Sequence, residues 1–104
     1  MKIWFDDDRL EQWMATLEKQ TIAKILRTID LLEQFGNQLG MPHSRKVDKR
    51  LFELRVRGKQ EVRLLYMFHK NQAVILHGFV KKSERIPNRD LDRARTLLKA
   101  LDEV

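Results

Sequence analysis

The stretch from residue 51 to residue 80 constrains the fold more than any other part of the chain. It holds three β-type runs separated by two short polar turns: LFELRV (51–56), VRLLYMF (62–68) and AVILHGFV (73–80). The first two alternate between apolar and polar side chains, which is typical of strands that bury one face. The third is apolar almost throughout, which predicts a strand covered on both faces. We therefore expect these runs to form a sheet whose strands are joined by hairpin turns.

The polar residues within this sheet can be placed by a register argument. If the first hairpin is symmetric about Lys59, Arg55 lies directly opposite Arg63 on the face away from the core. Like charges in that position destabilise a strand pair, and an anion bound between them would remove the repulsion. If Asn71 lies near the centre of the second turn, His77 falls on the same face, close to Arg63. A slip of one residue in either register would break this cluster.

Three stretches outside the sheet place apolar residues at helical spacing. Two precede the sheet and one follows it, so we expect an N-terminal helical hairpin and a C-terminal helix. Either N-terminal stripe could instead dock a helix of a partner. We expect the stripes, and both tryptophans of the chain, to pack in the core. The stripes consist of Leu10, Trp13, Met14 and Leu17, then Ile22, Ile25, Leu26, Ile29, Leu32 and Phe35, and finally Leu91, Ala94, Leu98 and Leu101.

Short polar signals predict where these elements begin and end. One aspartate of the triplet 6–8 is expected to cap the first helix, because carboxylates suit the positive N-terminal end. Gly36 follows the second helix, where a residue of positive φ is common. Asn88 is expected to cap the last helix. Lys2–Phe5 predicts a short edge strand before the first helix.

The length and charge of the chain limit its class. A chain of 104 residues suits one domain, residues 1–104. Its 21 Lys and Arg against 15 acidic residues give a net charge of +6, which favours a polyanion or an acidic protein as partner, although a merely soluble basic domain fits equally well. The acidic N-terminus and the lack of a long apolar run predict a cytoplasmic protein with no membrane contact.

Cations flank the predicted sheet on both sides. One basic run precedes its first strand, and a second group follows its last strand. Such runs are mostly solvated surface, but next to a sheet they could equally line a groove that follows phosphates. The two groups are Arg45, Lys46, Lys49 and Arg50, and Lys81, Lys82 and Arg85.

Neither a metal site nor a cofactor site is predicted. The chain has no cysteine, which excludes disulfides, thiolate metal sites and cysteine nucleophiles. His43, His69 and His77 are too far apart in sequence to form a ligand pair on one helix turn. The four glycines are scattered and form no phosphate-binding loop.

Several segments of the sequence together match the pattern of a known protein family. The segments are GNQLGMP, RKVDKR, LFELR, VRLLY and ILHGFVKKSERIP, followed by a short charged helix, and the similarity extends in order over nearly the whole chain. Together they resemble the RelE/ParE-like toxin superfamily, and within it the phage-derived, HigB-type branch of type II toxin–antitoxin systems. The resemblance implies an α+β fold, in which an N-terminal helical hairpin packs on a small, twisted, mostly antiparallel β-sheet with a C-terminal helix.

The resemblance also implies an activity and partners. Many members of the superfamily are ribosome-dependent mRNA endonucleases that block translation and need no cofactor. In the HigB-type branch the antitoxin is usually a small helix-turn-helix protein (HigA-like), and the complex commonly represses its own operon, so operator DNA is reached through the antitoxin. Two other functions stay open: a ParE-type toxin that poisons DNA gyrase without catalysis, and a non-toxic, phage-derived nucleic-acid-binding module.

Five residues are predicted to be catalytic on this basis. Arg63 matches the family's strand arginine, Lys81 and Lys82 match its basic pair after the last strand, and Arg55 is typical of this branch. These cations would stabilise the charge that grows on phosphorus when the 2′-hydroxyl attacks. His77 is a candidate for proton transfer, although it could equally be a structural histidine of the sheet. We expect Arg63, Lys81 and Lys82 to share one hollow at the end of the sheet.

The chain departs from the family at two places. Some members have a catalytic tyrosine in the C-terminal segment, where this chain reads IPN at residues 86–88. Some have lysines in the first hairpin strand, where this chain has Leu51 and Glu53. The general base is therefore not identified. We expect Glu53 to pair with Arg55 or Arg63, Tyr66 to lie in the core, and RNA to be bound by Arg45, Lys46, Lys49, Arg50 and Arg85.

Overall fold

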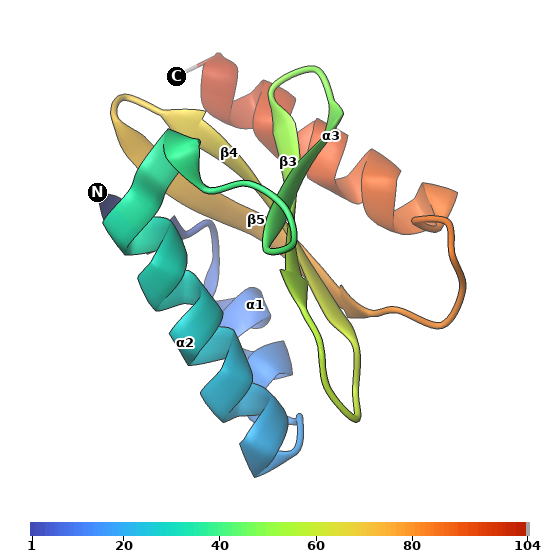
Figure 1. Ribbon diagram of the computed structural model, residues 1–104. Helices are drawn as coiled ribbons and strands as arrows, with labels where there is room; N and C mark the ends of the chain where they lie inside the picture. Colours follow the sequence, from blue (N-terminus) through green and yellow to red (C-terminus); the bar gives the residue numbers. More distant parts are fainter. Residues whose placement is uncertain (104) are drawn as a thin grey trace.

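A five-stranded sheet lies between helices on both of its faces (Figure 1). The computed structural model describes residues 1–103. The strand order is β1-β5-β4-β3-β2, in which β1 is parallel to β5 and all other neighbours are antiparallel. The predicted α+β fold class is confirmed. The elements are β1 (Lys2–Phe5), α1 (Asp8–Ala15), α2 (Lys19–Phe35), a 3₁₀ turn η1 (Gly36–Gln38), β2 (Ser44–Asp48), β3 (Leu51–Val56), β4 (Val62–His69), β5 (Gln72–Val80) and α3 (Asn88–Asp102).

Both predicted hairpin registers are found. Arg55 of β3 pairs with Arg63 of β4, directly across the strand pair. Leu65 of β4 pairs with His77 of β5, and a bulge follows at Leu65. Because side chains alternate along a strand, His77 and Arg63 lie on the same face of the sheet.

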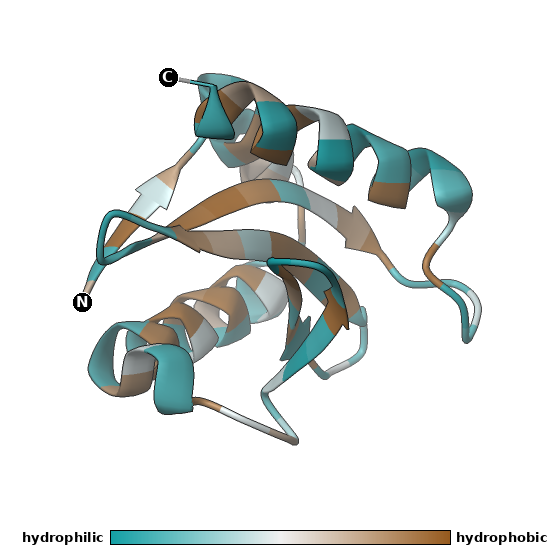
Figure 2. Ribbon diagram, turned by 90° about the horizontal axis from the view of Figure 1, so that it is seen from above, coloured by the Kyte–Doolittle hydropathy of each residue, from teal (hydrophilic) through white to brown (hydrophobic). Residues whose placement is uncertain are grey.

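The two faces of the sheet carry separate apolar clusters. On one face α1 and α2 pack their apolar stripes, through residues such as Leu10 and Ile25, against Leu54 and Leu64 of the central strands. On the other face α3 packs through Ala94 and its neighbours. Figure 2 shows the brown, apolar strands between α3 above and α2 below. This arrangement explains why β5 is apolar almost throughout, as the sequence predicted.

Two of the three residues predicted to end or cap a helix do so in the structure. Asp7 caps α1, because its side chain accepts a hydrogen bond from Arg9 N at 2.5 Å. Gly36 has a positive φ of 56° after α2, and its N–H donates to Leu32 O. The prediction that Asn88 caps α3 was wrong. Asn88 is the first helical residue, and the capping position belongs to Pro87, which provides no side-chain hydrogen bond.

The strand β2 was missed because its sequence, SRKVD, is too polar to signal a strand. It lies at the edge of the sheet and pairs with β3 alone, so it needs few apolar side chains.

Three predictions of core residues were also wrong: Trp4, Leu26 and Phe35 are about half exposed. Trp4 lies on an edge strand and points away from the neighbours Ile3 and Phe5 that face the core. Among the described residues, no helix combines the length and apolarity needed to cross a bilayer.

Candidate functional site

Arg63 lies at the centre of the predicted site, and its charged side chain is fully buried. Its exposed fraction is 0%, and that of its partner Glu53 is 2%. Arg63 Nε lies 3.2 Å from Glu53 Oε1, and Arg63 Nη2 lies 3.6 Å from Glu61 Oε2. Arg63 Nη1 also donates to Val62 O at 3.1 Å. The predicted pairing of Glu53 with a strand arginine is therefore confirmed, and Arg63 is the partner.

Two further arginines complete a cluster on this face. Arg45 of β2 lies opposite Glu53, with Arg45 Nη2 3.3 Å from Glu53 Oε2. Arg55 lies opposite Arg63. The carboxylates of Glu53 and Glu61 provide the counter-charge for Arg63, so the strands can pair without a bound anion. We call these five residues, Arg45, Glu53, Arg55, Glu61 and Arg63, the arginine–glutamate cluster.

The electrostatics of Arg63 depend on its carboxylate neighbours. Burial lowers the pKa of Arg63 from its ordinary value, while the nearby charge of Glu53 raises it. Arg55 lowers this pKa as well, and Glu61 raises it. A guanidinium titrates so far above neutral pH that Arg63 remains charged. A buried charge of this kind needs its counter-charge, which makes Glu53 essential to the conformation of Arg63.

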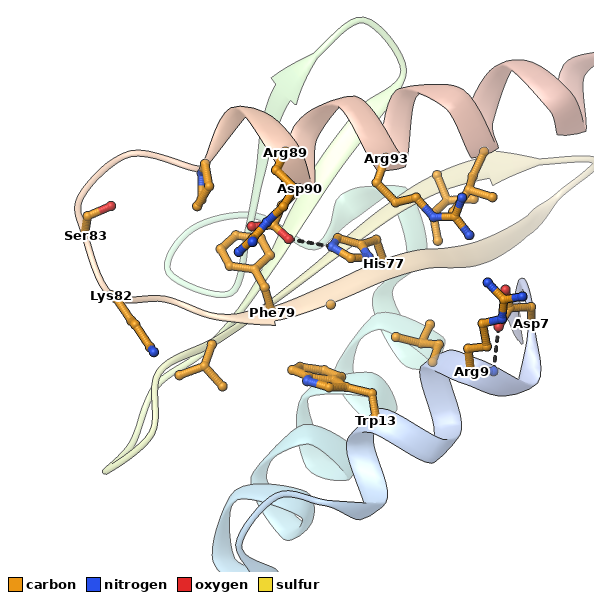
Figure 3. Close-up of a pocket in the computed structure, with 16 residues that line it drawn as sticks. Asp7, Arg9, Trp13, His77, Phe79, Lys82, Ser83, Arg89, Asp90 and Arg93 are labelled. Carbon is orange, nitrogen blue, oxygen red and sulfur yellow. Dashed lines mark hydrogen bonds and ion pairs between the residues drawn. The ribbon is translucent and has the colours of Figure 1, made fainter.

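His77 lies at a separate hollow of about 700 Å³, between α1, β5 and the start of α3 (Figure 3). Its Nε2 lies 2.7 Å from Oδ1 of Asp90, a buried carboxylate on the first turn of α3. The His77 ring also stacks on Phe79, with ring centroids 6.3 Å apart. Lys82 lines the same hollow. The contact between His77 and Asp90 joins β5 to α3.

The structure distributes the predicted catalytic residues over three places. Arg63 is buried within the arginine–glutamate cluster, whereas His77 and Lys82 line the hollow beside α3. Arg55, the cluster residue opposite Arg63, also lines a smaller hollow of about 310 Å³ beside α2, where its Nη1 lies 3.5 Å from Met41 Sδ. Lys81 lines neither hollow, and its backbone N–H donates to Glu61 O at 2.7 Å. The expected common hollow of Arg63, Lys81 and Lys82 is therefore not present.

The predicted RNA-binding run is not one continuous surface. Arg45 and Lys46 are consecutive in β2, so their side chains point to opposite faces, toward Glu53 and Phe52 respectively. Lys49 and Arg50 form the turn between β2 and β3 and are exposed, and Arg50 is ion-paired with Asp102 of α3. Arg85 is exposed in the loop before α3.

Sequence reasoning missed two carboxylates of these sites. They are Asp90, in the first turn of α3, and Glu61, in the turn between β3 and β4. Neither position gives a local signal of its partner, because His77 and Arg63 come close only through the tertiary fold. Among residues 1–103 no group of three or more His, Cys, Asp or Glu side chains could hold a metal ion.

Comparisons with known proteins agree with this fold and sequence pattern. Residues 12–99 match the family described as phage derived protein Gp49-like (DUF891). Over 75 residues the chain is 36% identical to a protein of Mycobacterium tuberculosis described as "Putative toxin HigB3". That match covers 67% of this chain and 65% of the relative, so the chain spans slightly less than two thirds of the relative's length.

A solved structure shares the fold at low sequence identity. One chain of the heterotetrameric YoeB–YefM toxin–antitoxin complex from Staphylococcus aureus superposes with a TM-score of 0.54 and 17% identity. The superposition covers 72% of this chain and 90% of that chain. At this identity the likeness concerns the fold alone. From its sequence match the chain belongs to the phage-derived Gp49-like family (DUF891), and it shares its fold with a chain of the YoeB–YefM complex.

Proposed function

We propose that this protein is the toxin of a type II toxin–antitoxin system and cuts mRNA on the ribosome in the cytoplasm. The observation that carries the proposal is the arginine–glutamate cluster, in which Arg45 and Arg63 bind two carboxylates and Arg55 lies opposite Arg63 on the next strand. The cluster is therefore net positive while its arginines are held in fixed positions. Family membership, the HigB3 relative and the net charge of +6 support the same function.

In this proposal the phosphate of an mRNA replaces a carboxylate as the partner of an arginine. Glu61 is the weaker partner, because its side chain is 39% exposed and lies 3.6 Å from Arg63. A phosphate at this position would meet Arg63 and Arg55, which face each other across the strands. Guanidinium groups bind phosphate through paired hydrogen bonds, and these bonds strengthen as negative charge grows on the phosphate oxygens.

Cleavage requires a new bond, a broken bond and two proton transfers. The 2′-oxygen bonds to phosphorus and loses its proton to a base, while the bond from phosphorus to the 5′-oxygen breaks and that oxygen gains a proton. His77 and the lysines 81 and 82 are proposed for the proton transfers, and His77 is held by Asp90 through Nε2, which leaves Nδ1 for exchange. His77 lies on β5, on the same face of the sheet as Arg63. Because Lys81 and Lys82 lie outside the arginine–glutamate cluster, the proposal requires the segment after β5, which carries them, to approach the cluster when RNA binds.

The proposed partners follow from this function. Ribosome and mRNA are the substrate, and contact with RNA is assigned to Arg45, Lys46, Lys49, Arg50 and Arg85. A helix-turn-helix antitoxin of the HigA type would hold the toxin inactive. Operator DNA would be contacted through that antitoxin.

The proposal is tested by inducing the chain in a bacterium that lacks an antitoxin and mapping the 5′ ends of mRNA. The expected result is growth arrest with new mRNA ends inside translated regions. A Lys19→Ala variant, changed at an exposed position on α2, serves as the control that retains activity. Growth arrest with intact mRNA and gyrase-dependent DNA breaks would overturn the proposal in favour of a gyrase poison. Harmless expression would also contradict it, and would favour a non-toxic binding module.

A further inference from the structure

The sheet has an open edge along the last part of β5. The parallel partner β1 ends at Phe5, which pairs with Ile75, and the last hydrogen bond between these segments runs from Asp6 N to Ile75 O at 2.9 Å. β5 continues to Val80. Within residues 1–103, no strand pairs with residues 76–80 on this side.

The backbone of this edge offers free hydrogen-bonding groups at regular spacing. Lys81 N donates to Glu61 O at 2.7 Å, which fixes the phase of the pairing with β4. Hydrogen-bonded and non-hydrogen-bonded pairs alternate along antiparallel strands. Phe79 therefore bonds to β4, whereas Gly78 and Val80 direct their N–H and C=O groups away from β4, toward the open edge. Gly78 and Val80 are two residues apart, which is the spacing at which an added strand forms its hydrogen bonds.

The open edge lies in the 700 Å³ hollow that also contains His77. Figure 3 shows Trp13 of α1 on one side of β5, and His77 and Phe79 on the other. Gly78 has no side chain, and a Cβ atom at this position would lie 2.6 Å from Cζ3 of Trp13. Gly78 is buried beside Trp13, whereas Val80 is partly exposed, so the accessible part of this edge lies at Val80. There the hollow has apolar walls between which an extended chain can lie against the strand.

The rim of the hollow is mostly positive. Arg9, Lys82, Arg89 and Arg93 line it and are exposed, and none of them forms an ion pair within the described part of the chain. The two carboxylates of the lining, at positions 7 and 90, already accept from Arg9 N and bind His77 respectively. Arg93 also lies near Asp6, outside the lining. All four cations contribute unpaired positive charge, and Lys82 and Arg89 are the two that flank the loop between β5 and α3.

We propose that the open edge of β5 binds an extended, acidic segment of a partner protein as an additional strand. The backbone of the segment would pair with Gly78 and Val80, and its carboxylates would meet Lys82 and Arg89. RNA fits this place less well, because it offers no N–H and C=O groups at strand spacing. The proposal shares His77 and Lys82 with the proposed cleavage site, but it is tested by peptide binding and amide exchange and not by cleavage, so the two can fail separately.

Amide hydrogen exchange of the free protein tests the open edge. We expect the amide of Val80, which is partly exposed and not bonded to β4, to exchange much faster than the amide of Phe79, although both residues lie in one strand. Equal protection of these two amides would mean that the edge is already paired, and would overturn the proposal.

Peptide selection tests the ligand. The full-length protein is presented with a display library of random peptides of about twelve residues, long enough for one strand. Acidic peptides rich in β-formers should be enriched, and their binding should protect the amides of Gly78 and Val80. The proposal would be overturned if no peptide is enriched, or if the enriched peptides lack acidic residues.

Two variants then locate the binding. Val80→Pro removes an N–H that β4 does not use, and should weaken the selected peptides about tenfold. Lys82→Glu with Arg89→Glu should weaken them about tenfold or more, while the matched control Lys19→Glu with Lys99→Glu should not. A labelled oligouridylate is the competing probe. If it binds more tightly than the peptides, and loses affinity in the Lys82 and Arg89 variant but not in Val80→Pro, the hollow is an RNA site and the proposal is wrong.

Discussion

Arg63→Ala should destabilise the fold far more than loss of an exposed arginine would. The substitution leaves Glu53, 2% exposed, with a buried negative charge and only Arg45 as partner. Removing one member of a buried ion pair costs about 3–5 kcal/mol. The contact with Glu61 adds less than about 1 kcal/mol, because that carboxylate is 39% exposed and screened by water. We expect a total loss of about 3–5 kcal/mol, a large part of the stability of a domain this size.

A double variant separates the lost pair from lost packing. Glu53→Leu with Arg63→Leu removes both charges and retains apolar volume, and such replacements are often neutral or stabilising. We expect the double variant to be more stable than either Arg63→Ala or Glu53→Ala. Urea unfolding, followed by far-ultraviolet circular dichroism, gives the free energy of each variant.

Two results would contradict this account of the pair between Arg63 and Glu53. If Arg63→Ala loses less than about 1 kcal/mol, the pair is not the buried contact that the structure shows. If the double variant is less stable than Arg63→Ala, the loss comes from packing of the arginine stem and not from the unpaired carboxylate. Lys99→Ala, at an exposed position on α3, is the control and should change the free energy of unfolding very little.

Two further predictions concern the core and the open edge. Burial raises the pKa of Tyr66, the only tyrosine, above its ordinary value of about 10, so the stability from its neutral phenol is complete below that pH and is lost as pH rises through the folded pKa. Phenolate absorbance should therefore rise together with alkaline unfolding, and a rise before unfolding would contradict the burial. Gly78→Ala should destabilise by about 1–3 kcal/mol, because its Cβ would meet Trp13 and the rigid strand cannot yield. Gly40→Ala is its control, since no atom lies within 4 Å of the added Cβ, and equal urea midpoints for the two variants would refute the contact.

The sequence predicted the parts of the fold that depend on periodicity. The alternation predicted β3 and β4, and a hairpin symmetric about Lys59 predicted the register that pairs Arg55 with Arg63. The apolar run of β5 predicted cover on both faces. The edge strand β2 was not predicted, because it pairs with one neighbour only and its charged side chains obscure the alternation of apolar and polar residues. Trp4 was placed wrongly for a related reason: on an edge strand, parity exposes every second side chain regardless of its size.

The site was less predictable because its partners come from distant segments. Local pattern places Arg63 and Glu53 on one face, but it does not show that the pair would be fully buried. The bond from His77 to Asp90 depends on how α3 returns over the sheet after the loop that follows β5. No single-sequence pattern fixes the path of such a loop, so the expected common hollow of Arg63, Lys81 and Lys82 was not found.

The most direct test of the proposed function uses purified protein and ribosomes programmed with a defined mRNA. Primer extension maps the 5′ ends that form, and the Glu53→Leu with Arg63→Leu variant, once shown to be folded, is compared with the unmodified chain. We predict cuts within the translated region by the unmodified chain, and a loss of about 100-fold or more in the rate for the variant. A folded variant that cuts as fast as the unmodified chain would contradict the role of the arginine–glutamate cluster.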